Sequence, residues 1–187
     1  MHKPKEQIIS ITGDLGSGKS SVARLLAEKL GWQYYSTGMA QRKIAEELQI
    51  TTVELNLRAS SDSSIDKKID SVFKNPPWGD EPCVVDSRLA FYFLPDSFRV
   101  YLSVDADVAA ERIFHDMKRK SEKQYQTVEQ AKKACAQRRS LEIERFMNSY
   151  QLDITNPHNF DLIIDTTKLS LEQVCNKIVS QLPFKTT

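Results

Sequence analysis

The stretch Gly13-Asp14-Leu15-Gly16-Ser17-Gly18-Lys19-Ser20 decides the fold of this sequence. It fits the pattern G-x-x-x-x-G-K-[ST] in full. A β-branched run, Ile8 to Thr12, precedes it, and an amphipathic segment with helical spacing follows it. Backbone amides of such a glycine-rich loop, together with the start of the next helix, bind phosphate oxygens. The sequence therefore predicts a nucleotide triphosphate site between a strand and a helix, in preference to an ordinary glycine-rich turn.

Two residues of this loop have a specific expected role. Lys19 can reach the β- and γ-phosphates, and the Ser20 hydroxyl can bind Mg²⁺. The expected nucleotide-binding residues of the loop are Gly13, Asp14, Leu15, Gly16, Ser17, Gly18, Lys19, Ser20 and Ser21.

Outside the loop, short apolar runs alternate with segments of helical spacing. The runs rich in β-branched residues are typical of buried strands, and they lie at 8–11, 83–85, 100–102 and 162–164, with a further short strand at 33–35. Strands that alternate with helices indicate right-handed βαβ units and a parallel sheet covered on both faces. The sequence thus predicts a single α/β domain over residues 1–187.

Two segments are longer than a plain crossover. Residues 37–80 suggest helices at 40–48, at 51–59 behind a Thr51 cap and at 65–73, followed by a turn-rich break. Residues 111–148 suggest a charged helical segment. Because doubly wound sheets bind their ligands where the strands end, we expect both segments at that rim.

Composition excludes several classes of protein. The chain has 187 residues, and 26 Lys+Arg against 25 Asp+Glu leave a net charge of +1, which argues against a general nucleic-acid binder. No apolar run approaches the roughly 18 residues that a spanning helix needs, and the N-terminus resembles no secretory signal. The scattered cysteines and histidines match no zinc pattern, so we expect structural thiols. We therefore expect a cytoplasmic monomer with small-molecule substrates and no nucleic-acid or membrane partner.

Two further stretches follow predicted strands. Ser36-Thr37-Gly38 follows the second strand, with Arg42 one helical turn beyond it. A turn of small residues leaves room for a substrate that accepts a phosphoryl group, and Arg42 can bind the phosphate of that substrate through two hydrogen bonds. A helix cap followed by a surface arginine fits this stretch equally well. The third strand ends at Asp86, followed by Arg88. This order would place the Asp86 carboxylate beside Mg²⁺ or beside the oxygen that attacks the phosphoryl group, and Arg88 at the phosphate of the acceptor substrate. The alternative is that Asp86 caps a helix and Arg88 is solvated.

Arginines recur along the second long segment, at Arg112, Arg119, Arg138 and Arg145. The last two are seven residues apart, so one helix face can direct both inward. Phosphoryl transfer depends mainly on positioning and charge neutralisation, so such arginines fit a kinase for a small acceptor. We expect Arg112, Arg138 and Arg145 to repel one another until phosphate oxygens arrive between them. A solvated helix face is the alternative.

Taken together, these stretches resemble the cytidylate kinases of the nucleoside monophosphate kinase group, most closely the short type typical of archaea. The resemblance runs from Ile8 to about Val179. The matching stretches are Ile11 through Gly31, Ser36-Thr37-Gly38 with Arg42, Asp62 to Asp70, Asp86 to Ala90, Ala110 to Ile113, Arg138 and Arg145, Tyr150 to Ile154, and Asp161 to Thr167.

The resemblance implies a P-loop NTPase fold: five parallel strands in the order 2-3-1-4-5 flanked by helices, with an arm for the nucleoside monophosphate (NMP) at 37–80 and a lid at 112–145. It implies transfer of the γ-phosphoryl group from ATP, with Mg²⁺, to CMP or dCMP. By position, the acceptor-binding residues would be Ser36, Gly38, Arg42, Asp66 and Arg88. The catalytic residues would be Lys19, Asp86, Arg112, Arg138 and Arg145. Mg²⁺ would be held by Ser20 and Asp86, and adenine would lie near Asp165, Thr166, Thr167 and Lys168.

The chain also departs from the family pattern. Asp14 replaces a proline often found in the loop, Ser36 stands where many bacterial members have aspartate, Ser87 replaces a glycine, and Arg139 stands where the family usually has an acidic residue. These changes leave phosphoryl transfer intact and bear on base specificity. The Asp62–Asp70 segment also fits a plain amphipathic helix.

Two other functions remain open at this point. One is another small-molecule P-loop kinase, adenylate kinase-like or dephospho-coenzyme A kinase-like. The other is a nucleotide-binding regulator without catalysis.

Overall fold

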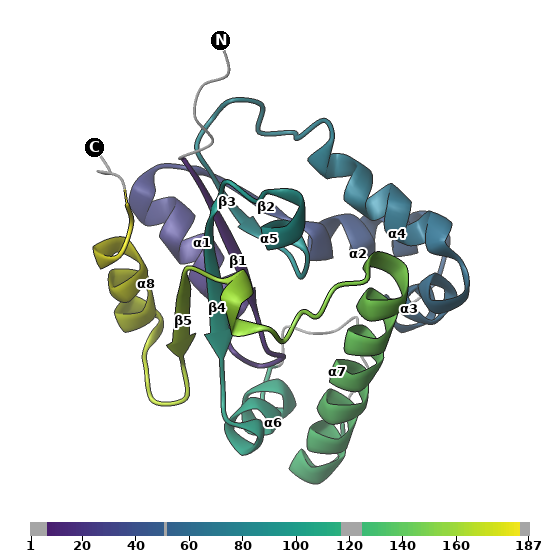
Figure 1. The fold of residues 1–187 in the computed structure, drawn as a ribbon. Coiled ribbons are helices and arrows are strands. Elements are labelled where there is room, and N and C mark those ends of the chain that lie inside the picture. Colours follow the sequence, from purple (N-terminus) through teal and green to yellow (C-terminus); the bar gives the residue numbers. More distant parts are fainter. Residues whose placement is uncertain (1–6, 51, 117–124, 184–187) are drawn as a thin grey trace.

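The computed structural model describes residues 7–50, 52–116 and 125–183. Its centre is a five-stranded sheet in the order β2-β3-β1-β4-β5, and every neighbouring pair of strands is parallel (Figure 1). The strands are β1 (Ile8–Gly13), β2 (Gln33–Ser36), β3 (Cys83–Asp86), β4 (Phe98–Ser103) and β5 (Leu162–Asp165). The predicted fold class and strand order are both confirmed.

One face of the sheet is covered by α1 (Lys19–Leu30) and α8 (Leu171–Ser180) (Figure 1). Helix α1 begins directly after Gly18 and ends at Gly31, which adopts a left-handed conformation that glycine tolerates without strain. Helix α8 begins with a capping box between Ser170 and Gln173. The apolar stripes of both helices bury against Ile9, Ile11, Val84, Val100, Leu102 and Ile164.

The opposite face is covered by the short helix α5 (Ala90–Phe93) and by the turn that contains Trp78. Cys83 and Val85 of β3 point into this layer. A third apolar cluster joins Leu89 and Phe91 to Phe146 on the long helix α7 (Val128–Tyr150), together with Ile154. Through this cluster α7 is packed onto the part of the chain that directly follows β3.

Because all the strands are parallel, their carboxyl ends share one edge of the sheet. Both long segments of the sequence lie around that edge (Figure 1). The first contains α2 (Thr37–Glu47), α3 (Thr52–Ser61), α4 (Ser63–Asp70) and the 3₁₀ turn η1 (Ser71–Phe73); the second contains α6 (Ala106–Phe114) and α7. A further 3₁₀ turn, η2 (Pro157–Asn159), precedes β5.

The expected helices differ from the observed ones at their ends. Helix α2 begins at Thr37, directly after β2, and the expected charged helix at 111–148 is divided between α6 and α7. The second helix starts anew at a side-chain cap, because Thr127 accepts a hydrogen bond from the Gln130 amide at the beginning of α7. Thr51 and Arg119 lie outside the described residues.

The three cysteines are thiols, as expected, and Cys83 and Cys175 are buried. Among the described residues, no helix combines the length and the apolar character needed to cross a bilayer.

Candidate functional site

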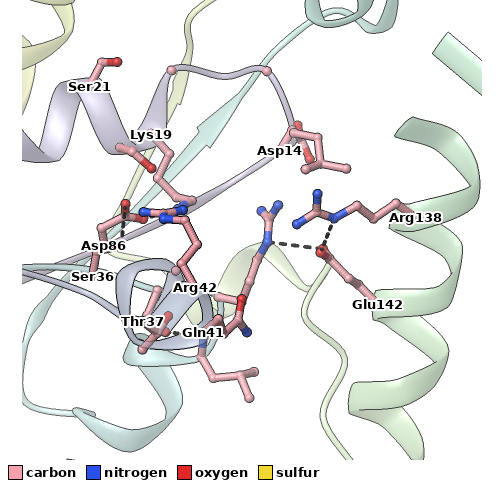
Figure 2. A pocket seen from close by; sticks show the side chains of 18 of the residues that line it. Asp14, Lys19, Ser21, Ser36, Thr37, Gln41, Arg42, Asp86, Arg138 and Glu142 are labelled. Atoms are coloured by element: carbon pink, nitrogen blue, oxygen red, sulfur yellow. Dashed lines mark hydrogen bonds and ion pairs between the residues drawn. The ribbon is translucent and has the colours of Figure 1, made fainter. Parts of the chain in front are cut away.

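A cavity of about 620 Å³ lies at the carboxyl edge of the sheet. Its walls come from the phosphate-binding loop, the ends of β2 and β3, the start of α2, the end of α4, and helices α6 and α7. Figure 2 places Lys19, Asp86 and Arg42 on one side of it and Arg138 and Glu142 of α7 on the other. The cationic side chains in its lining are Lys19, Arg24, Arg42, Arg88, Arg112, Arg138 and Arg145.

The phosphate-binding loop is held in shape by the rest of the fold. The Ser17 hydroxyl donates to the Asp14 carbonyl at 2.8 Å, and the Asp14 amide donates to the Leu102 carbonyl at 2.9 Å. Gly16 has φ of +79°, and a Cβ atom there would lie 2.8 Å from the backbone of Ala109 on α6. Only glycine tolerates both this positive φ and this close contact, so glycine at position 16 allows the loop to lie directly against α6.

Lys19 and Asp86 form an ion pair between the start of α1 and the end of β3. Asp86 is 1% exposed and also accepts hydrogen bonds from Tyr34 and Ser36, both at 3.3 Å. Burial alone would raise the pKa of the Asp86 carboxyl, but the charge and hydrogen bond of Lys19, together with Ser20 and Arg88, outweigh burial and lower this pKa. Burial lowers the pKa of Lys19, while Asp86 acts in the opposite direction. The pair therefore holds an ammonium group at the base of the loop.

Glu142 on α7 is a buried carboxylate surrounded by arginines. Its Oε2 lies 3.2 Å from Nε of Arg88, and its Oε1 lies 3.3 Å from Nε of Arg138 (Figure 2). Burial would raise the pKa of Glu142, but the positive charges of Arg88, Arg138 and Arg145 lower it. The expectation that Arg138 meets only other cations until phosphate arrives is therefore wrong, because Arg138 already pairs with Glu142; for Arg112 and Arg145 the expected repulsion stays a prediction.

Arg112 on α6 has a different environment. Its Nη2 donates to the carbonyls of Thr166 at 2.9 Å and Thr167 at 3.2 Å, and its Nη1 donates to the carbonyl of Gly16 at 3.3 Å. The Thr166 hydroxyl in turn donates to the Ser17 carbonyl at 3.1 Å. Arg112 thus joins the phosphate-binding loop to the loop that follows β5, while its side chain also lines the cavity.

The comparisons with known proteins agree with this geometry. A protein-family profile described as an AAA domain matches residues 9–139. The chain is 34% identical over 169 residues to a cytidylate kinase of Natronomonas pharaonis, covering 89% of this chain and 84% of the relative. It is 33% identical over 180 residues to a cytidylate kinase of Sulfolobus acidocaldarius, covering 95% and 94%.

The chain belongs to the cytidylate kinase family. The similarity to these relatives supports the function of a nucleoside monophosphate kinase for this chain. A longer relative is similar as well: an S-adenosylmethionine-dependent nucleotide dehydratase of Lacinutrix mariniflava is 32% identical over 172 residues, and the match covers 91% of this chain but 35% of that protein. The solved structure of a shikimate kinase from Bacteroides thetaiotaomicron has a TM-score of 0.64 at 15% identity, covers 95% of this chain and 98% of its own, and shares the fold.

Most of the residues singled out from the sequence line this cavity. They are Asp14, Leu15, Gly16, Gly18, Lys19, Ser20, Ser21, Ser36, Gly38, Arg42, Asp86, Arg88, Arg112, Arg138 and Arg145. Gly13, Ser17 and the residues from Asp165 to Lys168 are not part of the cavity lining, although Thr166 contacts the phosphate-binding loop at Ser17. Asp66 belongs to α4, but its side chain is outside the described residues.

Three carboxylates of the cavity were missed by the sequence analysis: Asp70, Asp116 and Glu142. Asp70 ends α4 and accepts a hydrogen bond from Tyr150, the last residue of α7. Glu142 lies four residues after Arg138 and three before Arg145, a helical spacing at which side chains meet. That spacing was a usable signal for an arginine–carboxylate cluster.

The residues present fit a magnesium ion. Ser20 and Asp86 offer a hydroxyl and a carboxylate next to the loop, and hard oxygen ligands are those that Mg²⁺ prefers. Among the described residues, no cluster of three His, Cys, Asp or Glu side chains could hold a metal alone. Magnesium in phosphate-transfer sites is usually held by one or two protein ligands together with substrate phosphates, which agrees with this donor set.

We predict that Glu142→Gln destabilises the protein mainly above pH 5. The folded pKa of Glu142 lies below its ordinary value of 4.5, so its ion pairs contribute stability above that value and lose it as pH falls through the folded pKa. Removing one partner of a buried ion pair costs about 3 kcal/mol at pH 7. The free energy of unfolding, measured in urea from pH 3 to 7, should therefore show a difference between wild type and variant that shrinks towards acid.

Glu144→Gln is the control for this prediction, because Glu144 is exposed on the same helix. It should change stability by less than about 0.5 kcal/mol at any pH. A Glu142→Gln difference that stays constant with pH would contradict the ion-pair assignment.

Proposed function

We propose that this protein is a nucleoside monophosphate kinase that transfers the γ-phosphoryl group of ATP to CMP or dCMP. The observation that carries the proposal is one continuous cavity that joins a phosphate-binding loop to a second set of arginines. Donor and acceptor phosphates need to lie in line within one site, and cations must neutralise the charge that develops between them. A regulator that only binds a nucleotide would need the loop alone.

The donor half of the proposed site is the loop from Gly13 to Ser21. Its amides and the start of α1 would hold the phosphates of ATP, and Lys19 would reach the β- and γ-phosphates. When bound through Ser20 and Asp86, Mg²⁺ neutralises charge on the phosphate oxygens. The loop from Asp165 to Lys168 would border adenine, which is supported by its contacts with the back of the phosphate-binding loop.

The acceptor half lies between α2, α4 and the end of β3. Arg42 and Arg88 line this side and would hold the acceptor phosphate, with Ser36 and Gly38 beside it. The lining also includes the apolar side chains of Ile69, Leu89 and Phe146 and the carboxylate of Asp70. Asp70 accepts a hydrogen bond from Tyr150, whose ring packs against Phe146.

Apolar side chains near the Asp70 carboxylate suit cytosine. The exocyclic amino group of cytosine donates hydrogen bonds to a carboxylate, whereas uracil presents a carbonyl oxygen at the same place. We therefore propose that Asp70, rather than Asp66 alone, takes part in choosing the base.

The proposed catalytic cations between the two halves are Arg112, Arg138 and Arg145. Each lines the cavity, and Arg138 and Arg145 belong to the same helix. Within the single domain, residues 37–80 would act as the arm for the monophosphate and residues 112–145 as the lid. Closure of the lid would exclude water, which suppresses ATP hydrolysis in place of transfer.

Lys19→Ala should lower kcat by about 10²–10³-fold, because one preorganised charge on the transferring group is worth that much. The measurement is ADP release with CMP as acceptor, in a coupled assay. Lys29→Ala is the matched control: Lys29 belongs to the same helix but is exposed and pairs with Glu172, so kcat should stay within about twofold. Near-normal turnover of Lys19→Ala would contradict the donor site.

CMP and dCMP should be the best acceptors in a panel of monophosphates, with UMP weaker and AMP and GMP poor. Asp70→Asn should reduce the preference for CMP over UMP by about tenfold, the value of one well-placed hydrogen bond. Asp80→Asn, an exposed carboxylate in the same inserted region, should leave the preference unchanged. If AMP were best by tenfold in kcat/KM, the pyrimidine assignment would be wrong and the kinase assignment would stand.

If residues 112–145 act as a lid, their hydrogen exchange should change when ligands bind. Protection across 112–145 should rise when a bisubstrate analogue binds, since phosphate contacts the arginines only in the closed state. Arg138→Ala should cut kcat by more than tenfold with little change in ATP affinity, while Lys133→Ala, an exposed change on the same helix, should alter neither. Equal protection with and without the analogue would rule out the lid.

A further inference from the structure

Asp14 lines the cavity, and its side chain forms a cluster with Tyr101 and Arg139, two residues to which the proposed reaction gives no role. The hydroxyl of Tyr101 on β4 donates to Oδ1 of Asp14 at 2.5 Å. Nη2 of Arg139 on α7 donates to the same hydroxyl at 2.8 Å and lies 3.6 Å from Asp14 Oδ1. The Val104 amide donates to Asp14 Oδ2 at 3.3 Å. The cluster therefore joins the phosphate-binding loop, the sheet and the helix of the proposed lid.

Asp14 is in an unfavourable place for a carboxylate. It is the second residue of the phosphate-binding loop, its side chain is 28% exposed, and it lines the cavity beside the amides that would bind phosphates (Figure 2). A negative charge there repels the negative charge of ATP unless a cation compensates it.

Arg139 is the cation in contact with Asp14. Its Nη2 contacts Asp14 and Tyr101, and its Nη1 is buried and makes no hydrogen bond to the described residues. Arg139 also lies within 6.0 Å of the centre of the Tyr101 ring, which adds a cation–π contact.

The neighbouring residue on α7 faces a different target. Arg138 lies against Glu142 at the cavity, whereas Arg139 reaches the phosphate-binding loop. Because the two residues are adjacent on one helix, the contact of Arg139 with Asp14 also restricts where Arg138 can lie.

Asp14 and Arg139 are 125 positions apart in the sequence, yet they meet in the structure. A carboxylate at position 139 would lie beside that of Asp14 and repel it, so a cation at this position suits the aspartate of the loop.

We propose that Arg139 is a positioning residue for ATP. It compensates the charge of Asp14, holds that carboxylate against Tyr101 and Val104 and away from the phosphates, and docks α7 on the phosphate-binding loop. This inference rests on the proposed function in that ATP is the ligand of the loop.

The test is direct binding of a non-hydrolysable ATP analogue with Mg²⁺, measured by calorimetry without acceptor. Arg139→Ala should weaken binding about tenfold, because Asp14 is left uncompensated. Asp14→Asn should bind as tightly as wild type or more tightly. The double variant Asp14→Asn with Arg139→Ala should recover to within about threefold of wild type. Lys133→Ala is the control on the exposed side of α7 and should bind as wild type does.

A second readout separates charge from docking. Arg139→Lys keeps the positive charge but lacks the planar guanidinium group that can contact Asp14 and Tyr101 together. Compared with Arg139→Ala, this variant should therefore regain most of the affinity for the ATP analogue but a smaller part of kcat. CMP affinity should change less than twofold in every variant, because the cluster lies on the donor side.

Three results would overturn the proposal. They are unchanged analogue binding in Arg139→Ala, a double variant as weak as Arg139→Ala, or an Asp14→Asn variant that binds tenfold more weakly than wild type. Analogue binding by Asp14→Asn tests the proposal even if Arg139→Ala fails to fold. A wild-type protein that binds no ATP analogue would contradict the proposed function instead.

Discussion

The ion pair between Lys19 and Asp86 is the contact on which the site depends. It joins the first residue of α1 to the last residue of β3, and Asp86 is almost completely buried at that point. A carboxylate in such surroundings stays ionised only with a cation beside it, and the ammonium stays at the base of the loop only with an anion to hold it. The pair therefore fixes the start of α1 against the end of β3, the strand that pairs with β1.

The same principle explains how so many cations share one cavity. Glu142 lies against Arg88 and Arg138, and Arg112 donates to backbone carbonyls. These oxygens play the part that phosphate oxygens would play, so the arginines are arranged before a nucleotide arrives. Preorganised charge requires little rearrangement when charge develops in a reaction, which is the physical advantage of carrying internal anions among the arginines.

The fold was predictable because its signals are local. The glycine-rich loop and the β-branched runs are continuous in sequence, and their alternation restricts the topology to a parallel sheet. The site was predictable only in part. Whether Asp66 or Asp70 reaches the cavity depends on how α4 is rotated, and the sequence repeats Ile-Asp at both positions. Burial of Glu142 likewise depends on where α7 docks, which no local pattern determines.

The contacts of Thr166 have a consequence for how the site is assembled during synthesis. Its hydroxyl and carbonyl connect to Ser17 and Arg112, so the phosphate-binding loop obtains part of its support from a residue about 150 positions later in the chain. The flank of α1 that α8 covers also has no apolar partner until α8 has emerged. Ribosomes add about 5–20 residues per second, so the early part of the chain waits roughly 8–30 s for these contacts. The segment that carries the nucleotide signature is therefore synthesised first but supported last, and a nascent chain that ends before α8 leaves an apolar flank of α1 uncovered.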